Sequence, residues 1–168
     1  MKDTIIIVSG MAAAGKTTFA EWLSHKVCVP LLSVDDLWGK FGTTTIPFAQ
    51  YWVLCEDIMK QSSPLIIEFG FWDEQKPMIN ELVKKYKYQT VNIHFVTSIE
   101  LAHQRFNDRR KLGGTEPQIT LERYIEIVEY SKFFQFGDCV IGVDTTDFSR
   151  VSYENIAKQI QQLAMGIK

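Results

Sequence analysis

The sequence has few of the features that mark specialised protein classes. Its three cysteines, Cys28, Cys55 and Cys139, lie far apart in 168 residues, without the spacing of a metal site or a redox motif. We expect them to be small buried apolar residues in a reducing cytosol. No apolar run approaches the roughly 18 residues that a membrane span needs, and the apolar run near the N-terminus is too short for a signal peptide. These absences predict a cytoplasmic protein without a membrane segment.

An excess of positive charge is also absent. The chain has 18 basic and 20 acidic residues, which give a formal net charge of −2. Nucleic-acid-binding proteins concentrate positive charge, so the sequence disfavours nucleic acid as a partner. The composition, 46% hydrophobic and 23% charged, excludes the disordered and coiled-coil classes. The length fits one domain that spans residues 1–168. We expect the protein to be a monomer or a homodimer.

What the sequence does have is a regular alternation of short apolar runs and helix-like stretches. The pattern predicts strands at residues 5–8, 31–34, 64–69, 91–96 and 139–143, and helices at residues 17–26, 48–61, 76–88, 98–111, 120–132 and 152–165. Continuous apolar strands that alternate with helices indicate an α/β fold whose parallel sheet is covered on both faces. Two polar segments with glycine, residues 39–47 and 111–117, are candidate moving loops around a site.

The sharpest motif follows the first predicted strand and opens the first predicted helix. It fits the pattern G-x-x-x-x-G-K-[ST] throughout, with Gly10, Met11, Ala12, Ala13, Ala14, Gly15, Lys16 and Thr17. Such a loop turns backbone N–H groups toward phosphate oxygens at the positive end of a helix. We expect Lys16 to reach the β- and γ-phosphates, Thr17 to offer its hydroxyl to Mg²⁺, and Thr18 to contact the α-phosphate. The alternative is a glycine turn that joins strand and helix by chance.

Residues beyond this loop distinguish among classes of nucleotide-binding protein. A GTP-binding switch needs an N/T-K-x-D segment after a late strand, and neither residues 97–100 nor residues 144–147 fit. A mechanical ATPase usually has an acidic pair at the end of its metal-binding strand, where this chain has only Glu68. The class that remains is the small-molecule phosphotransferases.

Acidic residues at the ends of two predicted strands are candidate site residues. Asp35 and Asp36 follow the second strand, where a carboxylate can accept the proton of an attacking hydroxyl; alternatively, Asp36 caps a helix or turn that begins near Leu37. Glu68 ends the third strand, where it would meet Mg²⁺-bound water or the acceptor's hydroxyls, or else form a buried ion pair.

Three arginines cluster on one predicted helix just before a glycine-bearing loop. Arg105 and Arg109 are four residues apart and share a helix face, and Arg110 is adjacent. Phosphoryl transfer spreads negative charge onto the γ-phosphate, and arginines that close over it can stabilise that charge. The alternative is an ordinary solvated helix face.

These motifs together resemble the P-loop kinases of the polynucleotide kinase, chloramphenicol phosphotransferase and zeta-toxin type, and the small kinases often labelled AAA domain. The resemblance is carried by residues 10–18, 34–37 and 66–68 and by Arg105, Arg109 and Arg110. It implies a sheet order of 2-3-1-4-5, ATP and Mg²⁺ as cofactors, and a lid at about residues 103–118. It also implies that Asp35 is the general base and that the loop with Thr145 flanks the adenine. Glu68 departs from the polynucleotide kinase pattern, which has aspartate there.

An aromatic-rich segment, residues 38–72, contains three of the four tryptophans and would wall the acceptor side of such a kinase. Trp38, Phe71 and Trp72 follow strand ends and are expected acceptor contacts, whereas we expect Phe48 and Trp52 to pack in the core. Residues 30–75 contain two lysines but seven acidic residues, which disfavours a phosphate-rich acceptor.

We therefore predict ATP- and Mg²⁺-dependent transfer of a phosphoryl group to a hydroxyl of an antibiotic-, sugar- or nucleoside-like molecule. Two alternatives stay open at this point: a regulatory ATPase module read by a partner protein, and a zeta-toxin-like sugar-nucleotide kinase.

Overall fold

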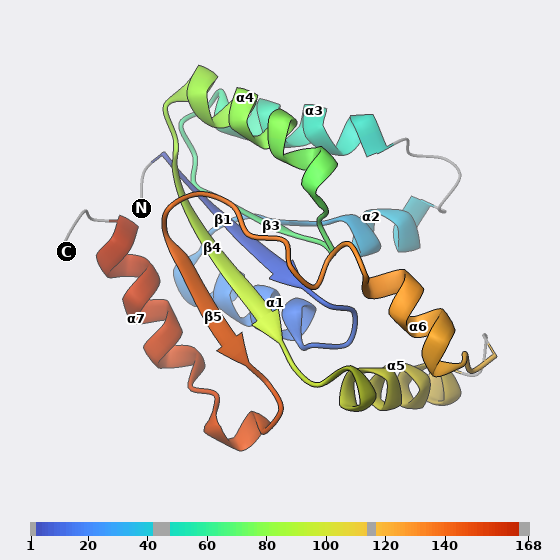
Figure 1. The fold of residues 1–168 in the computed structure, drawn as a ribbon. Helices are drawn as coiled ribbons and strands as arrows, with labels where there is room; N and C mark the ends of the chain where they lie inside the picture. The colour runs from blue at the N-terminus through green and yellow to red at the C-terminus, as the bar shows by residue number, and fades with distance from the viewer. Residues whose placement is uncertain (1–2, 42–47, 114–116, 165–168) are drawn as a thin grey trace.

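The structure, a computed structural model, describes residues 3–41, 48–113 and 117–164. Its centre is a five-stranded, all-parallel sheet with the order β2-β3-β1-β4-β5 (Figure 1). The strands are β1 (Thr4–Gly10), β2 (Leu31–Ser33), β3 (Leu65–Glu68), β4 (Gln89–Val96) and β5 (Val140–Asp144). The α/β class and the strand order that the sequence predicts are both confirmed.

Helices cover both faces of the sheet and extend beyond one of its ends. They are α1 (Lys16–Val27), α2 (Val34–Phe41), α3 (Phe48–Met59), α4 (Lys76–Tyr86), α5 (Ile99–Gly113), α6 (Leu121–Val128) and α7 (Tyr153–Ala164), with short 3₁₀ turns η1 (Asp73–Gln75) and η2 (Phe148–Arg150). Among the described residues, no helix is long and apolar enough to cross a membrane.

The central strand β1 contributes to two cores, one on each face of the sheet. Successive side chains of a strand point to opposite faces, so Ile5 and Ile7 lie in one cluster while Ile6 and Val8 lie in the other. Helices α3 and α4 pack over the first cluster, and α1 and α7 pack over the second (Figure 1). Burial on both faces explains why the predicted strands are continuous apolar runs.

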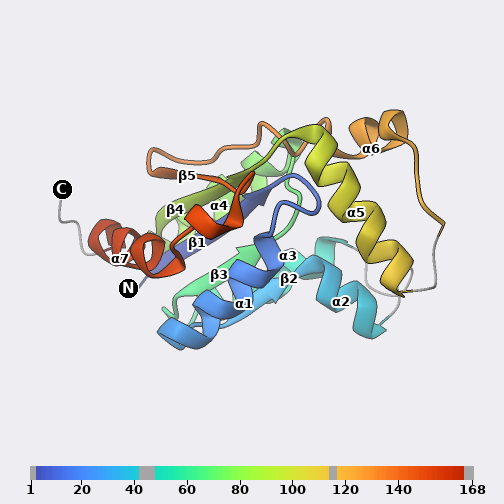
Figure 2. The same ribbon diagram turned by 90° about the horizontal axis from the view of Figure 1, so that it is seen from below.

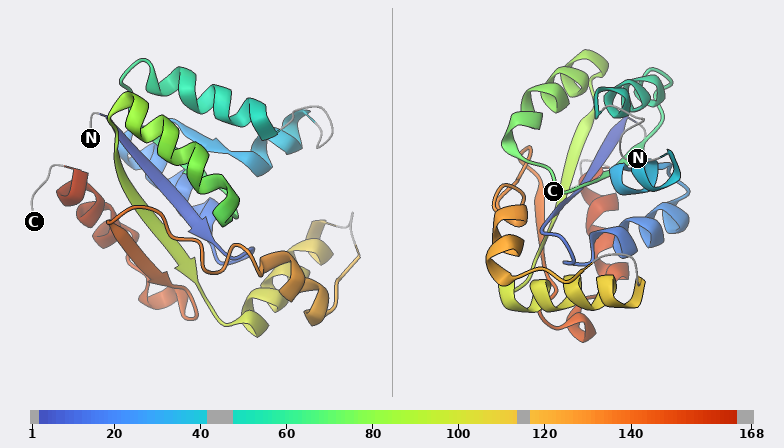
Figure 3. Two further views of the ribbon diagram at one scale, coloured as in Figure 1. Left: turned by 45° about the horizontal axis from the view of Figure 1, so that its top comes forward. Right: turned by 90° about the vertical axis from the view of Figure 1, so that its right-hand side faces the viewer.

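The carboxyl ends of the strands lie together at one end of the molecule. Helices α2 and α5 lie at this end, and α6 packs beside α5, whereas both described chain ends lie at the opposite end (Figures 2 and 3). In register, Val8 pairs with Glu68 and Gly10 pairs with Phe95, which brings the ends of β1, β3 and β4 together. Ligands of open α/β sheets bind at this edge.

Three local details differ from the sequence-based expectation. Helix α2 begins at Val34, directly after β2, rather than near Leu37, and both aspartates lie in its first turn, where negative charge stabilises a helix. The predicted loop at residues 39–47 therefore begins inside a helix; residues 42–47 lie outside the described part, as do residues 114–116 of the second predicted loop. Cys55 is buried as expected, but Cys28 is exposed at the left-handed C-cap of α1.

Candidate active site

A cleft of about 490 Å³ opens at the carboxyl end of the sheet. It is walled by the loop after β1, the first turn of α2, the segment after β3, helices α5 and α6, and η2. The lining residues are Ala12, Ala13, Gly15, Lys16, Thr17, Thr18, Asp35, Phe69, Gly70, Trp72, Arg105, Phe106, Arg109, Ile127, Ser131 and Phe148. Segments that are distant in sequence thus meet around the predicted phosphate loop.

The two glycines of the loop are required by its backbone and by close neighbours. Gly10 has φ +125°, and a Cβ there would lie 2.1 Å from the carbonyl oxygen of Phe95. Gly15 has φ +94°, and a Cβ there would lie 2.8 Å from the ring of Phe148. Ala13 also has a positive φ of 59°. The loop therefore has the curled backbone that presents N–H groups to an anion.

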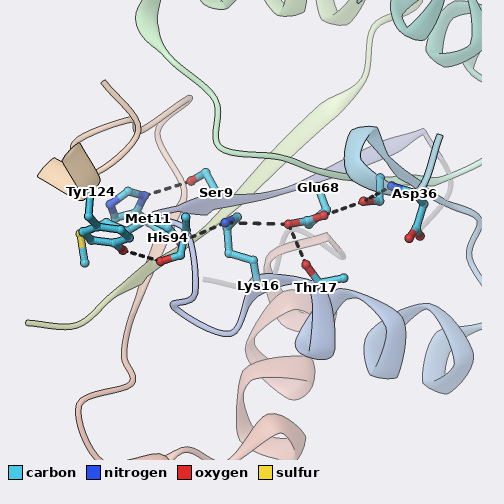
Figure 4. Close-up of polar contacts among 10 residues, drawn as sticks. Ser9, Met11, Lys16, Thr17, Asp36, Glu68, His94 and Tyr124 are labelled. Carbon is cyan, nitrogen blue, oxygen red and sulfur yellow. Dashed lines mark hydrogen bonds and ion pairs between the residues drawn. The ribbon is translucent and has the colours of Figure 1, made fainter. Parts of the chain in front are cut away.

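Lys16 is buried at the start of α1, and its ammonium group has two neighbours from different segments (Figure 4). Nζ donates a hydrogen bond to the carbonyl oxygen of Met11 at 3.0 Å and lies 3.9 Å from Oε1 of Glu68. Burial lowers the pKa of Lys16, while the carboxylates of Glu68 and Asp35 oppose that shift. The lysine is thus held beside the loop where phosphate oxygens would replace its present partners.

Glu68 joins three parts of the site at the end of β3. Oε2 accepts a hydrogen bond from Ser33 at 2.8 Å, and Oε1 accepts one from the hydroxyl of Thr17 at 3.3 Å (Figure 4). The carboxyl group is almost completely buried, and burial raises its pKa while Lys16 opposes the shift. Glu68 therefore forms the predicted buried ion pair, with Lys16 as its partner. It also contacts Thr17, the other residue predicted to bind the metal ion.

The oxygen atoms of Glu68 and Thr17 suit Mg²⁺, which keeps water and phosphate ligands, better than a metal ion that is bound by protein side chains alone. Among the described residues there is no group of three or more histidine, cysteine or acidic side chains able to hold a metal ion. Mg²⁺ is usually bound by one or two protein oxygens together with substrate phosphates and water. The Thr17 hydroxyl and the Glu68 carboxylate, adjacent to a phosphate loop, supply that kind of partial oxygen shell.

The two aspartates of α2 differ in where they lie. Asp35 lines the cleft and is close enough to Lys16 and Glu68 to affect the pKa of each. Asp36 is not among the lining residues; its backbone N–H donates to the Ser33 hydroxyl at 3.5 Å, and its carboxylate points away from Glu68 (Figure 4). Of the two aspartates, Asp35 is therefore the one that lines the cleft.

The three arginines of α5 also have different surroundings. Arg105 and Arg109 both line the cleft. Nη2 of Arg105 donates to the carbonyl oxygen of Thr145 at 2.9 Å, its guanidinium lies 4.4 Å from the ring centre of Phe148, and its Nη1 is buried without a hydrogen-bond partner in the described part of the chain. Arg110 is absent from the lining and donates to the carbonyl oxygen of Pro117 at 2.8 Å, so it ties α5 to the segment before α6.

Two further residues that the sequence predicts to contact ligands, Thr145 and Phe71, contact other parts of the protein instead. Thr145 is fully buried, and its hydroxyl donates to the carbonyl oxygen of Ala14 at 2.9 Å, so it anchors the loop after β5 to the phosphate loop. Phe71 is fully buried against Phe134, with ring centres 5.4 Å apart, and does not line the cleft. Trp72 does line the cleft, while the side chain of Trp38 lies outside the described residues.

The core expectation for Trp52 is confirmed, because it packs in the apolar cluster under α3. The same expectation for Phe48 concerns a side chain outside the described residues.

Sequence reasoning missed residues that reach the phosphate loop from the second half of the chain. The hydroxyl of buried Tyr124 on α6 donates to the carbonyl oxygen of Ala12 at 2.6 Å. Phe148 contacts Gly15 and stacks on Arg105, and Ile127 and Ser131 complete the wall. The only signal for Phe148 is its position a few residues past the carboxyl end of a strand; Tyr124 has the ordinary spacing of a core residue.

The order of the parallel sheet, the glycine-rich loop after β1 and the helices on both faces are those of a P-loop fold, and solved structures share this fold. A protein from Chloroflexus aurantiacus proposed to be a kinase has a TM-score of 0.81 at 22% identity, covering 96% of this chain and 98% of that one. Kti12 from Chaetomium thermophilum, solved with ADP-AlF3, has a TM-score of 0.66 at 12% identity, with coverages of 95% and 98%.

The APS kinase CysC of Mycobacterium tuberculosis, solved with AMPPNP and APS, has a TM-score of 0.62 at 12% identity, with coverages of 96% and 97%. No protein-family model and no curated protein sequence matches the chain. At these identities the likeness establishes the fold, and the narrower resemblance to polynucleotide kinases, chloramphenicol phosphotransferases and zeta toxins stays a prediction.

Proposed function

We propose that this protein is an ATP- and Mg²⁺-dependent phosphotransferase that moves the γ-phosphate to a hydroxyl group of a small molecule. The observation that carries the proposal is that Lys16, Thr17, Asp35, Arg105 and Arg109 line one cleft, with Glu68 directly behind it. A phosphate loop alone would serve any nucleotide-binding protein. A carboxylate and two arginines facing the same cleft are what phosphoryl transfer to an alcohol requires.

The phosphate loop would hold the triphosphate through its backbone N–H groups, with Lys16 on the β- and γ-phosphates. Thr17 and Glu68 are the residues that would hold Mg²⁺, either directly or through water. When bound there, Mg²⁺ would supply positive charge that offsets the negative charge developing on the phosphates during transfer. The Thr17–Glu68 hydrogen bond keeps both oxygens at the same side of the loop before the ligand arrives.

Asp35 would act as the general base. It is exposed in the first turn of α2, lines the cleft, and can accept the proton of the acceptor's hydroxyl while the oxygen attacks the γ-phosphate. A general base must reach its proton directly or through one water molecule. The position of Asp35 in the lining of the cleft supports this role.

Arg105 and Arg109 would stabilise the charge on the transferred group from α5. Arg105 has a buried donor, Nη1, for which the described residues supply no acceptor, as expected of a group that awaits an anionic ligand. We further propose that residues 1–168 act as one domain and that residues 103–118 are its lid. The Arg110–Pro117 hydrogen bond would make the two arms of the lid move together.

A regulatory ATPase is the second candidate, because a phosphate loop serves any nucleotide-binding protein, and Kti12, solved with ADP-AlF3, is as similar in fold as the APS kinase. The lining of the cleft favours the transferase, since Asp35 faces the space beside the loop that an acceptor would need. A zeta-toxin-like sugar-nucleotide kinase would need cations for the acceptor's phosphates; the described lining offers only Lys16, Arg105 and Arg109, which the triphosphate would engage.

The test is a screen of Mg·ATP with a library of nucleosides, sugars, vitamins and hydroxylated antibiotics, read by mass spectrometry. We expect at least one compound to gain a phosphoryl group with the wild-type protein and none to do so with Lys16→Ala. Appreciable ATP hydrolysis that produces no phosphorylated compound and responds to a partner protein would support the regulatory ATPase instead.

A further inference from the structure

A second, smaller cavity adjoins the cleft on the side away from the phosphate loop. Its volume is about 320 Å³, and its lining residues are Trp72, Glu74, Ile127, Tyr130 and Ser131. Three of these five, Trp72, Ile127 and Ser131, also line the main cleft. The two cavities therefore share a wall, and a molecule held in the smaller one can extend toward the site of transfer.

The smaller cavity exposes large apolar side chains that would normally be covered. Trp72 is 36% exposed, Ile127 is 43% exposed and Tyr130 is 65% exposed, although they come from two separate segments of the chain. Contiguous exposed apolar surface with a polar rim is typical of binding sites. The cavity lies at the low end of the 300–1,000 Å³ range of ligand pockets, so the shared opening suits a small molecule that uses both cavities.

The charge of the lining limits what can bind. Glu74 is exposed and is the one carboxylate among the described residues that line the smaller cavity, and this described lining includes no lysine or arginine. An anionic group there would meet a carboxylate without a compensating cation. A cationic group would meet the same carboxylate together with two aromatic side chains, Trp72 and Tyr130, and the face of an aromatic ring attracts cations.

We propose that this cavity binds the ring-bearing, positively charged end of the phosphate acceptor, with Trp72, Ile127 and Tyr130 as the apolar platform and Glu74 as the charge-selecting residue. The inference rests on the proposed function, since it names the acceptor class of the same site. The acceptor is then a hydroxyl compound with an aromatic or other apolar ring and an amine. Its hydroxyl lies toward Asp35 in the main cleft.

The test uses three para-substituted benzyl alcohols that share a ring and a primary hydroxyl and differ in charge: aminomethyl, methyl and carboxylate. Dissociation constants are measured by ligand-observed NMR on the whole protein, without nucleotide. We expect the aminomethyl compound to bind about tenfold more tightly than the carboxylate compound, as the sum of a cation–π contact and an exposed charge pair allows.

Variants test whether the preference for the aminomethyl compound arises in the smaller cavity. Tyr130→Ala should weaken binding of the aminomethyl compound by about three- to tenfold, because it removes one exposed ring face. Phe133→Ala is the matched control, since Phe133 is 76% exposed, lies three residues further on and lines neither cavity; it should leave binding unchanged. Glu74→Gln should weaken binding of the aminomethyl compound by about threefold, leave binding of the methyl compound unchanged and strengthen binding of the carboxylate compound.

Equal affinity for the cationic and anionic compounds would overturn the proposal, as would equal effects of Tyr130→Ala and Phe133→Ala. If none of the three compounds binds, the proposal is also wrong, and the exposed aromatic surface is then better explained as a docking surface for a macromolecule. Binding needs no phosphoryl transfer, so these results are separate from the library screen, whose failure would overturn the proposed function.

Discussion

The two halves of the proposed site, which comprises the cleft and the smaller cavity, are built in opposite ways. The phosphate half, residues 10–18 with Glu68, is largely buried, and Lys16, Thr17 and Glu68 are linked to one another or to the backbone. The acceptor half, Asp35 with Trp72, Glu74, Ile127 and Tyr130, consists of exposed side chains from three segments. On the proposed function, the difference predicts that phosphate binding depends on a preorganised network, while acceptor choice depends on individual surface side chains.

The largest effect that this comparison predicts is in the phosphate half. Lys16→Ala should lower kcat/KM for ATP by about 10³-fold or more, because one buried cation contributes both to triphosphate binding and to transition-state stabilisation. Steady-state kinetics with an identified acceptor measure it. Lys26→Ala is the control, since Lys26 is on the same helix but pairs with Glu154 in solvent at 3.0 Å. Similar losses in both variants would contradict the account.

The second prediction separates the two aspartates of α2. Asp35→Asn should lower kcat by about 10²–10³-fold through loss of the base, while the dissociation constant for ATP changes little. Asp36→Asn should keep kcat within about threefold of the wild type, because Asp36 does not line the cleft. Kinetics combined with calorimetric ATP binding measure both quantities. If Asp36→Asn proves the more damaging change, the assignment of the base is wrong.

The third prediction concerns Glu68, whose carboxylate repels phosphate and would attract Mg²⁺. Glu68→Gln should strengthen binding of metal-free ATP by about tenfold and weaken Mg²⁺-dependent transfer by at least about tenfold, because one buried charge is removed. Titration of the protein with ATP in the presence of EDTA gives the first value, and transfer kinetics at increasing Mg²⁺ concentration give the second. Glu21→Gln on the exposed face of α1 is the control and should change neither. Weaker binding of metal-free ATP in Glu68→Gln would refute this role.

A smaller effect tests how far the phosphate half is stabilised by the second half of the chain. Tyr124→Phe removes the 2.6 Å hydrogen bond to the carbonyl oxygen of Ala12 and should lower the free energy of unfolding by about 1 kcal/mol. Tyr130→Phe, in the acceptor half, removes an exposed hydroxyl and should leave stability within about 0.5 kcal/mol of the wild type. Urea denaturation compares them; equal stability of the two variants would contradict the proposed anchoring.

The smallest effect is a pH dependence at His94, behind the phosphate loop. Its Nδ1 lies 3.0 Å from the Ser9 hydroxyl (Figure 4), and its Nε2 lies 2.8 Å from the carbonyl oxygen of Lys132. Burial lowers the pKa of His94 below the ordinary 6.5. The unfolded chain therefore binds the proton first, so stability should fall as pH decreases from about 6.5 toward the folded pKa.

The slope of the unfolding free energy against pH, between pH 7 and pH 5, measures the contribution of His94 to stability. In His94→Gln the slope should be shallower than in the wild type, whereas His25→Gln, at an exposed position of α1, should keep the wild-type slope. An unchanged slope in His94→Gln would show that the imidazole does not contribute.

Much of the phosphate half could be predicted because its information is contiguous in sequence. Gly10, Gly15 and Lys16 have fixed spacing between a strand and a helix, and the strand order follows from the family resemblance. The anchoring of that half could not be predicted. Tyr124 reaches Ala12 across 112 positions, and no local pattern distinguishes its hydroxyl from that of another core tyrosine.

The acceptor half was predicted less well for a related physical reason. Composition identified an aromatic, acidic region, but Phe71 and Trp72 are adjacent and only the second lines the cleft, because successive residues point in different directions. Likewise Arg110 shares a helix with Arg105 and Arg109 but contacts Pro117 instead of the cleft. Tertiary packing decides these orientations, and sequence spacing alone does not.

The most direct test of the central claim follows the γ-phosphate itself. The protein is incubated with Mg²⁺, ATP labelled in the γ-phosphate, and the best compound from the library screen, and the label is traced by chromatography. We predict that the label appears in the organic acceptor in equal amount to the ADP formed, and that Asp35→Asn abolishes this transfer while still binding ATP. Label found only in inorganic phosphate, at the same rate with and without the acceptor, would contradict the account.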